Sequence, residues 1–188
     1  MPTTIRTRAA VLAVCAAVAA AGACKRKPTP PDIPALVADL HSEDAEKRGK
    51  ASLALIGVGE PAGPAVAEML KSENLAHRLT AASTLFGMGP KGKAAVPALA
   101  DTLSDPDREL RIAAAMALES IGPDAAPAVP ALIAALKDKE GLMRQRVVIA
   151  LGSIGPAASS AIPALVEAGK WDPVRGHVDE AIARIRAR

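Results

Sequence analysis

Aromatic residues are almost absent from this sequence. Among 188 residues there is no Tyr, one Phe (Phe86) and one Trp (Trp171). Half of the residues are nevertheless apolar, so a core must consist mainly of Ala, Leu, Ile and Val, and abundant Ala favours helices. Carbohydrate and single-stranded nucleic-acid sites use aromatic side chains as stacking platforms, so neither is expected. The composition predicts a closely packed all-α protein.

Cysteine is also scarce, and Cys15 and Cys24 are the only two. Residues 1–23 carry Arg6 and Arg8, continue through an alanine-rich apolar run and end in small residues, which is the layout of a secretory signal peptide. The run is too short and too weakly apolar to favour a spanning helix. Cleavage would discard Cys15 and leave a single thiol, which cannot form an internal disulfide.

The run Ala21-Gly22-Ala23-Cys24 resembles the lipobox of bacterial lipoproteins, in which the cysteine is acylated and becomes the new N-terminus. The resemblance implies that Cys24 is the lipid anchor, with palmitate among its acyl chains. Ala21 departs from the Leu, Val or Ile usual there, so ordinary cleavage after Ala23 is the alternative. Residues 24–32 are charged and rich in proline, which predicts an extended linker.

These features predict an exported protein of the cell envelope. Because position 25 is Lys and not Asp, the segment resembles lipoproteins anchored to an outer membrane and facing the periplasm. A soluble periplasmic or secreted protein is the alternative. Removal of residues 1–23 would leave 21 basic against 20 acidic side chains, a balance that does not favour nucleic-acid binding.

Histidine occurs only at His41, His77 and His177, and none stands in a His-x-x-x-His or His-Glu pair. Metal binding on one helix face needs such spacing, so no metal site is expected. Each histidine neighbours charged or capping residues, so we expect all three to be solvated. Convergent titratable groups are otherwise few, and we expect no catalytic residues, no cofactor and no enzyme activity.

One short sequence motif recurs through residues 33–188. Prolines separated by 30, 33, 33 and 33 residues are each followed by Ala and then by Leu or Val: Pro34, Pro64, Pro97, Pro130 and Pro163. Three other columns keep this register, and they contain Ser or Asp, then Arg, then Gly. They are Ser42, Ser72, Asp105 and Asp138; Arg48, Arg78, Arg111 and Arg144; and Gly59, Gly89, Gly122 and Gly155.

The columns fit a unit of two helices. Proline suits the first turn of a helix, so a short first helix begins at each proline and buries residues such as Leu99 and Leu103. Ser or Asp suits the N-cap of a longer second helix, with Pro106 at its first position in one copy. Gly followed by Pro ends that helix. Its apolar residues recur at helical spacing, as in Ile112, Ala115, Leu118 and Ile121.

Residues 105–122 resemble the consensus of HEAT repeats, in particular the short bacterial kind found in phycobilisome lyases. The resemblance extends over about residues 33–188. It implies a right-handed α-α superhelix of about five two-helix repeats, with first helices on the convex side and second helices on the concave side. Two copies depart from the pattern. The connection from Gly59 to Pro64 is three residues shorter than later ones, and in the last copy Trp171 holds the cap position while Asp172 follows it.

One column allows two interpretations, namely Arg48, Arg78, Arg111 and Arg144. In the first, the guanidinium groups pair within the chain, with caps and carbonyl groups of neighbouring repeats, as in the ladders common in this family. In the second, they form a row of donors on the concave face that binds a partner, favouring an acidic one. Bilin lyase activity is not expected, because the second helices present mostly Ala, Ser and Thr at their open positions.

A solenoid offers a long groove without pocket chemistry, so we expect a non-catalytic protein–protein interaction scaffold displayed in the cell envelope. Its partners are a protein or peptide and, through the lipid anchor, a membrane. We expect no nucleic acid and no small-molecule substrate. An accessory or regulatory subunit of an envelope enzyme or transport complex is the alternative, and an enzyme with unrecognised active groups is a third.

Overall fold

The computed structural model describes residues 31–170 and 174–187, and the compact unit is Asp32–Arg188. All regular secondary structure within these ranges is helical, which confirms the all-α prediction. The predictions for the signal peptide, for Cys24, for most of the linker and for Trp171 and Asp172 lie outside the described residues.

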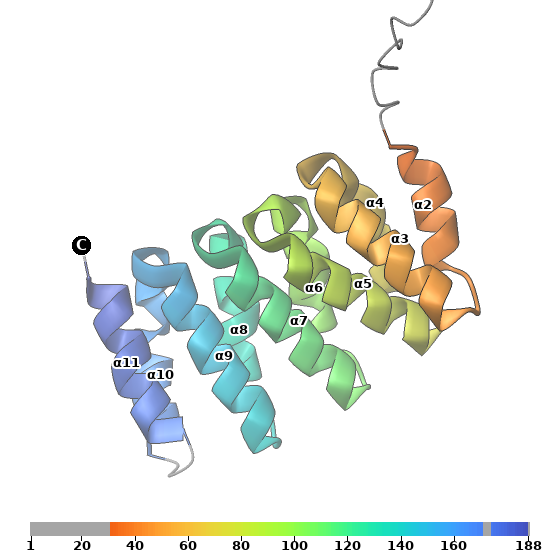
Figure 1. Ribbon diagram of the computed structural model, residues 1–188. Helices are drawn as coiled ribbons and strands as arrows, with labels where there is room; N and C mark the ends of the chain where they lie inside the picture. The colour runs from red at the N-terminus through yellow and green to blue at the C-terminus, as the bar shows by residue number, and fades with distance from the viewer. Residues whose placement is uncertain (1–30, 171–173, 188) are drawn as a thin grey trace, which may run out of the picture. The chain divides into compact units, whose positions relative to one another are not determined.

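The helices form five pairs, as the repeat pattern predicted, and each pair has a short first helix and a longer second helix (Figure 1). The first helices are α2 (Ile33–Leu40), α4 (Gly63–Glu68), α6 (Val96–Thr102), α8 (Val129–Ala135) and α10 (Ile162–Ala168). The second helices are α3 (Ala45–Val58), α5 (Leu75–Met88), α7 (Arg108–Ile121), α9 (Gly141–Ile154) and α11 (Arg175–Arg186).

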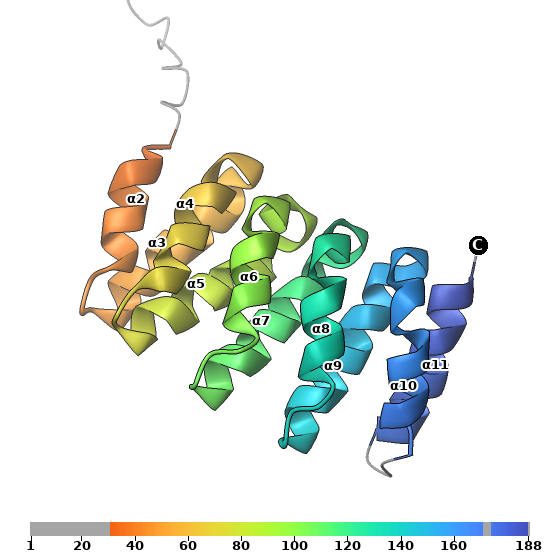
Figure 2. The ribbon, with the colours of Figure 1, turned by 180° about the vertical axis from the view of Figure 1, so that it is seen from behind.

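The pairs stand in a row, with the second helices in one layer and the first helices in the other (Figures 1 and 2). Neighbouring second helices pack directly against each other from α3 to α11, whereas neighbouring first helices make few contacts. The second helices therefore carry most of the direct helix–helix contact between repeats, and their placement on the concave side stays a prediction.

The proline and glycine columns lie at the helix ends where the sequence places them. Each first helix begins one residue before its proline, so the proline occupies the first turn. The second helices α3, α5, α7 and α9 end immediately before Gly59, Gly89, Gly122 and Gly155, whose φ angles of +55° to +76° are rarely adopted by other residues.

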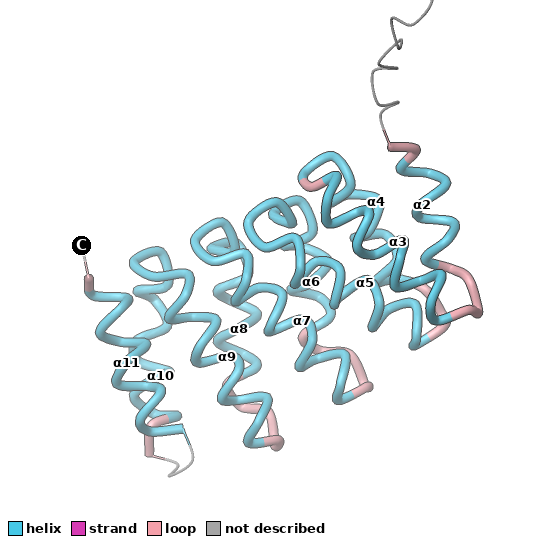
Figure 3. Tube along the Cα trace, in the orientation of Figure 1, coloured by secondary structure: helices cyan, strands magenta, loops and turns pink. Residues whose placement is uncertain are grey.

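The segment after each glycine is a 3₁₀ helix, which the sequence pattern did not reveal. These segments are η1 (Glu60–Ala62), η3 (Gly89–Ala95), η4 (Gly122–Ala128) and η5 (Gly155–Ala161), and another, η2 (Met69–Lys71), extends α4. The first is shorter than the other three that follow a glycine, which confirms the shortened connection. Loops remain mainly at the other end of each pair, where the second helices begin (Figure 3).

The predicted N-caps are wrong by two residues. Asp107 caps α7 by accepting from the Leu110 N–H at 2.9 Å, so Pro106 precedes the helix. Asp105 instead accepts from the Asp107 N–H at 2.8 Å and closes a turn before the cap. Asp138 makes the same turn by accepting from the Glu140 N–H at 2.8 Å. The Ser or Asp column therefore shapes the loop, and the helix begins after it.

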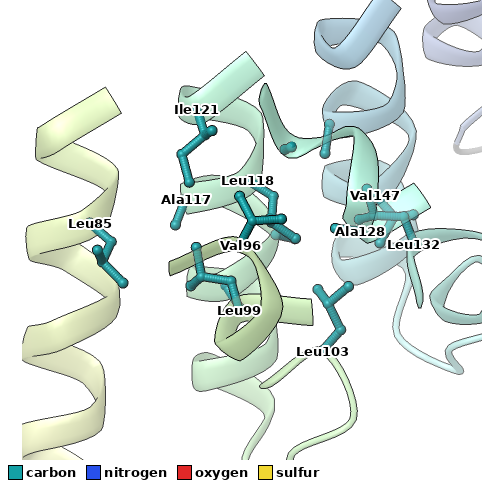
Figure 4. Close-up of a cluster of buried hydrophobic side chains, with 14 of the residues drawn as sticks. Leu85, Val96, Leu99, Leu103, Ala117, Leu118, Ile121, Ala128, Leu132 and Val147 are labelled. Atoms are coloured by element: carbon teal, nitrogen blue, oxygen red, sulfur yellow. The ribbon is translucent and has the colours of Figure 1, made fainter. Parts of the chain in front are cut away.

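The core runs continuously between the two layers. Leu99, Leu103 and the predicted residues of α7 are buried, including Leu118, which is fully enclosed. Figure 4 shows the central part of this cluster, gathered from helices of consecutive repeats. Close packing of Ala and Leu in place of aromatic rings is thus what holds neighbouring repeats together.

By length and composition alone, one described segment, Gly141–Ala168, is apolar enough to cross a membrane. It comprises α9, η5 and α10, with the positive φ angle of Gly155 between the two α-helices. Of its apolar window, 44% is buried inside the protein. In this structure Val148, Leu151 and Leu165 of this segment belong to the core of the stack, whereas Leu142 and Val166 are exposed.

Candidate interaction surface

The arginine column lies at the loop that joins the two helices of each repeat. In four repeats Nη1 of the arginine donates to two backbone carbonyl groups of that loop. Arg48 bonds to Ser42 O at 2.7 Å and Glu43 O at 2.9 Å, and Arg144 bonds to Asp138 O at 2.8 Å and Lys139 O at 3.0 Å. Arg78 and Arg111 make the equivalent pairs of bonds. Each guanidinium therefore closes the loop of its own repeat.

Two of these arginines also contact the next repeat. Arg111 Nε donates to Asp138 Oδ2 at 2.9 Å, and Arg78 Nε lies 3.7 Å from Asp105 Oδ2. The side chains of both Arg–Asp pairs are largely buried, so water screens the attraction within each pair poorly. These contacts are the ones expected if the arginine column pairs within the chain. Binding of a partner by these arginines stays a prediction.

The prediction that all three histidines are solvated is wrong for His77. Its side chain is buried, its ring packs edge-on against that of His41 with centroids 5.1 Å apart, and Nδ1 lies 3.5 Å from Ser72 Oγ. His41 belongs to the preceding repeat, so the sequence neighbours of His77 gave no indication of this burial. His41 itself is exposed, and His177 is half-buried beside Gln145.

An exposed apolar row crosses the second-helix layer. The residue five positions after the arginine column is Leu53 in α3, Met116 in α7 and Ile149 in α9, and Ser83 takes this place in α5. Phe86, one helical turn after Ser83, restores an apolar side chain in that helix. Leu53 is 72% exposed and Phe86 is 44% exposed, while Met116 and Ile149 are half-buried. The repeat pattern of the sequence alone did not indicate this row.

Polar contacts fix the helices beneath the row. Ser120 Oγ donates to the Phe86 carbonyl at 2.8 Å, and the hydroxyl groups of Ser52 and Thr84 are 2.8 Å apart. Both contacts join neighbouring second helices. Because the layer is cross-linked in this way, the exposed side chains stand on a surface formed before any partner arrives.

Ion pairs at the glycine end of the repeats are exposed. Lys93 Nζ lies 3.0 Å from Glu60 Oε1, and hydrogen bonding to Glu60, together with its negative charge, raises the pKa of Lys93. Both groups face water, so the pair contributes little to stability. Among residues 31–170 and 174–187, no three His, Cys, Asp or Glu side chains are grouped so that they could hold a metal ion.

A family model described as HEAT repeats matches this chain twice, over residues 33–119 and 96–183. No curated protein matches the sequence. These two matches together span most of the solenoid, including the arginine and glycine columns.

Solved structures of repeat proteins are similar. The complex of CpcE and CpcF of phycocyanin lyase from Nostoc sp. PCC7120 contains a chain that is 23% identical, with 80% of this chain and 97% of that chain covered and a TM-score of 0.63. A designed armadillo repeat protein in complex with the peptide (KR)4 is 16% identical, with 82% of each chain covered and a TM-score of 0.60. At these identities the similarity shows the fold alone.

Proposed function

The chain belongs to the HEAT-repeat family, and on that premise we propose that it is a non-catalytic scaffold whose second-helix layer binds a protein or peptide. Repeat solenoids present extended surfaces of this kind, and their function lies in the surface of the particular chain. We further propose that a lipid on Cys24 displays the scaffold in the cell envelope. The linker of residues 24–32 would then separate the repeats from the membrane.

The observation that carries the proposal is the exposed apolar row of Leu53, Phe86, Met116 and Ile149. Isolated apolar side chains on a surface need no explanation, but apolar side chains on four consecutive helices, three at the same position of the repeat and Phe86 one turn later, form a strip. Burial of exposed apolar area is the main source of affinity in protein interfaces. Polar side chains such as Ser83 along the same strip would supply hydrogen bonds at its edges.

The similar structures support a partner of this class. One is a complex of two proteins, CpcE and CpcF, and another holds the peptide (KR)4. Neither partner is carried over to this chain, because the identities are too low. What the comparison supports is that this architecture accommodates a protein or a peptide.

Site-specific photo-cross-linking in the native cell tests the proposal. A photoreactive residue is placed at Leu53 or at Phe86, and as a control at Val166, which is exposed on the first-helix layer. We expect discrete cross-linked products from the first two positions and none from the third. Equal products from all three, or none from Leu53 and Phe86, would refute a binding surface on the second helices.

Purification from the same cells distinguishes the scaffold from the alternative, an accessory or regulatory subunit. Purification from detergent-solubilised membranes should recover the scaffold with substoichiometric partner. A stable stoichiometric complex with an enzyme or a transporter would identify an accessory subunit instead. Substituting Leu53→Asp and Phe86→Asp should abolish recovery of the partner, whereas Val166→Asp should retain it.

A further inference from the structure

A cavity of about 760 Å³ opens between the fourth and fifth repeats, at the end where the loops lie. Its lining is of two kinds. We call the apolar side chains Ile133, Leu136 and Ala164 the floor, and the charged side chains Lys137, Lys139 and Arg144, together with two carboxylates, the rim. The volume is within the range of pockets that enclose a small ligand or one or two peptide side chains.

The rim has an excess of positive charge. Its two carboxylates are already paired: Asp138 with Arg111 at 2.9 Å, and Glu167 with Lys170 at 2.7 Å. Lys137, Lys139 and Arg144 have no carboxylate within 4.0 Å among the described residues. Three cations that line one partly apolar cavity favour an anionic ligand, because their positive charges add at one place.

Arg144 supplies the directional contact. Its Nη1 is held by two loop carbonyls, which fixes the plane of the guanidinium. Its Nε is buried and has no hydrogen-bond partner among the described residues, although a buried donor normally has one. At the preceding interface the equivalent atom, Arg111 Nε, binds the carboxylate of Asp138.

The sequence register explains why the ladder stops here. The residue 33 positions after Asp105 is Asp138, but the residue 33 positions after Asp138 is Trp171, which has no carboxylate. Position 171 lies outside the described residues. At the position of the repeat that supplies a carboxylate to Arg78 and Arg111, the sequence therefore offers Arg144 none.

We infer that this cavity binds a carboxylate of the partner, in an acidic peptide segment whose neighbouring apolar side chain enters the floor. The carboxylate accepts from Arg144 Nε in the manner of Asp138 on Arg111, and Lys137 and Lys139 attract the remaining negative charge of the segment. This inference rests on the proposed function, because it presumes a protein partner.

Fluorescence anisotropy of the purified full mature chain tests the inference. The probe is a fluorescein-labelled peptide of alternating Glu and Leu, and the control probe has Gln in place of every Glu. We expect binding of the Glu peptide alone. Combined Lys137→Glu and Lys139→Glu substitutions should weaken it at least about tenfold, because attraction becomes repulsion. Combined Lys91→Glu and Lys93→Glu substitutions, which change the net charge equally on η3 at the other end of the repeats, should alter affinity by less than about twofold.

Four results would overturn the inference. The first is an absence of binding, or equal binding of the Gln peptide. The second is an equal loss of affinity in the Lys91→Glu, Lys93→Glu double variant, which would indicate attraction by net charge. The third is binding by Asp172→Asn but not by the unchanged chain, which would assign the cavity to a carboxylate of this chain. Anionic phosphatidylglycerol vesicles that bind through Lys137 and Lys139 while the peptide does not would also reject a protein ligand.

The outcomes for the cavity and for the scaffold can be distinguished. If Leu53 cross-links to a partner while the Glu peptide does not bind, the scaffold stands and the carboxylate site fails. If the peptide binds and no cross-link forms at Leu53 or Phe86, the proposal that the second-helix layer binds a partner is wrong. The proposal that the cavity binds a carboxylate is then still supported.

Discussion

Arg111 of one repeat donates to Asp138 of the next at 2.9 Å, and the two side chains are only 11% and 14% exposed. The same guanidinium holds its own loop through Asp105 O and Pro106 O. One side chain thus joins two consecutive loops. Asp138 in turn closes its own loop by accepting from the Glu140 N–H. The contact with Arg111 therefore links the conformations of the two loops.

Arg111→Met should therefore destabilise the protein by about 3 kcal/mol or more, because it removes three hydrogen bonds and leaves Asp138 without its cation. Chemical denaturation followed by far-ultraviolet circular dichroism measures this loss. The control is Arg108→Met in the same helix, whose half-exposed side chain lies 3.7 Å from Glu140 and should cost less than about 1 kcal/mol. Equal losses in both variants would contradict the structural role of Arg111.

Leu118→Ala should cost about 2–5 kcal/mol, because Leu118 is fully buried between the layers and its truncation leaves a cavity. Leu53→Ala removes the same atoms from an exposed side chain and should change the free energy of unfolding by less than about 0.5 kcal/mol. Urea titration of the two variants beside the unchanged protein makes the comparison. A small loss for Leu118→Ala would show that the proposed core face is not packed.

Glycine substitutions should act in opposite directions at two positions. Gly122 has a φ angle of +72° after α7, so Gly122→Ala should cost about 1–2 kcal/mol. Gly49 lies inside α3, where an added Cβ meets no atom within 4 Å, so Gly49→Ala should stabilise by about 0.5–1 kcal/mol. Differential scanning calorimetry measures whether each variant melts at a lower or a higher temperature than the unchanged protein. A higher melting temperature for Gly122→Ala would contradict the role of Gly122 in ending the helix.

Cys24→Ser should move the protein from the membrane fraction to the soluble exported fraction, because it removes the thiol that we propose is acylated. Fractionation with intact mass spectrometry of the mature protein checks this. An unchanged chain that begins at Cys24 without acyl mass, or that retains Met1, would contradict the anchor. Ala21→Leu, which brings the segment closer to the lipobox, should preserve membrane attachment.

Features encoded within one repeat could be predicted from the sequence. Pro97 and Gly122 restrict the backbone at their own positions, so they locate helix ends without knowledge of the neighbours. The N-cap was misplaced because Asp105 and Asp107 are both suitable capping residues, and only the course of the loop distinguishes them. The residue types alone therefore allowed two positions for the start of this helix.

Features that depend on contact between repeats could not be predicted. His77 is buried where its ring meets that of His41, which lies 36 positions earlier in the chain. The arginine column was visible in the sequence, but its bonds to loop carbonyls required the loop geometry. The apolar row was overlooked for a related reason: Ser83 interrupts its register, and Phe86 continues the strip only when the helix places it one turn away.

The unequal packing of the two layers has a mechanical consequence. Second helices contact each other along the whole row, whereas first helices contact the neighbouring repeats mainly through the 3₁₀ helices η3, η4 and η5. A load along the row would therefore stretch the second-helix layer against continuous helix–helix interfaces, whereas on the other side it would act on the shorter 3₁₀ contacts. We expect the stack to change its curvature more readily than its contour length, so that a ligand of different curvature is accommodated by bending and not by sliding one repeat past another.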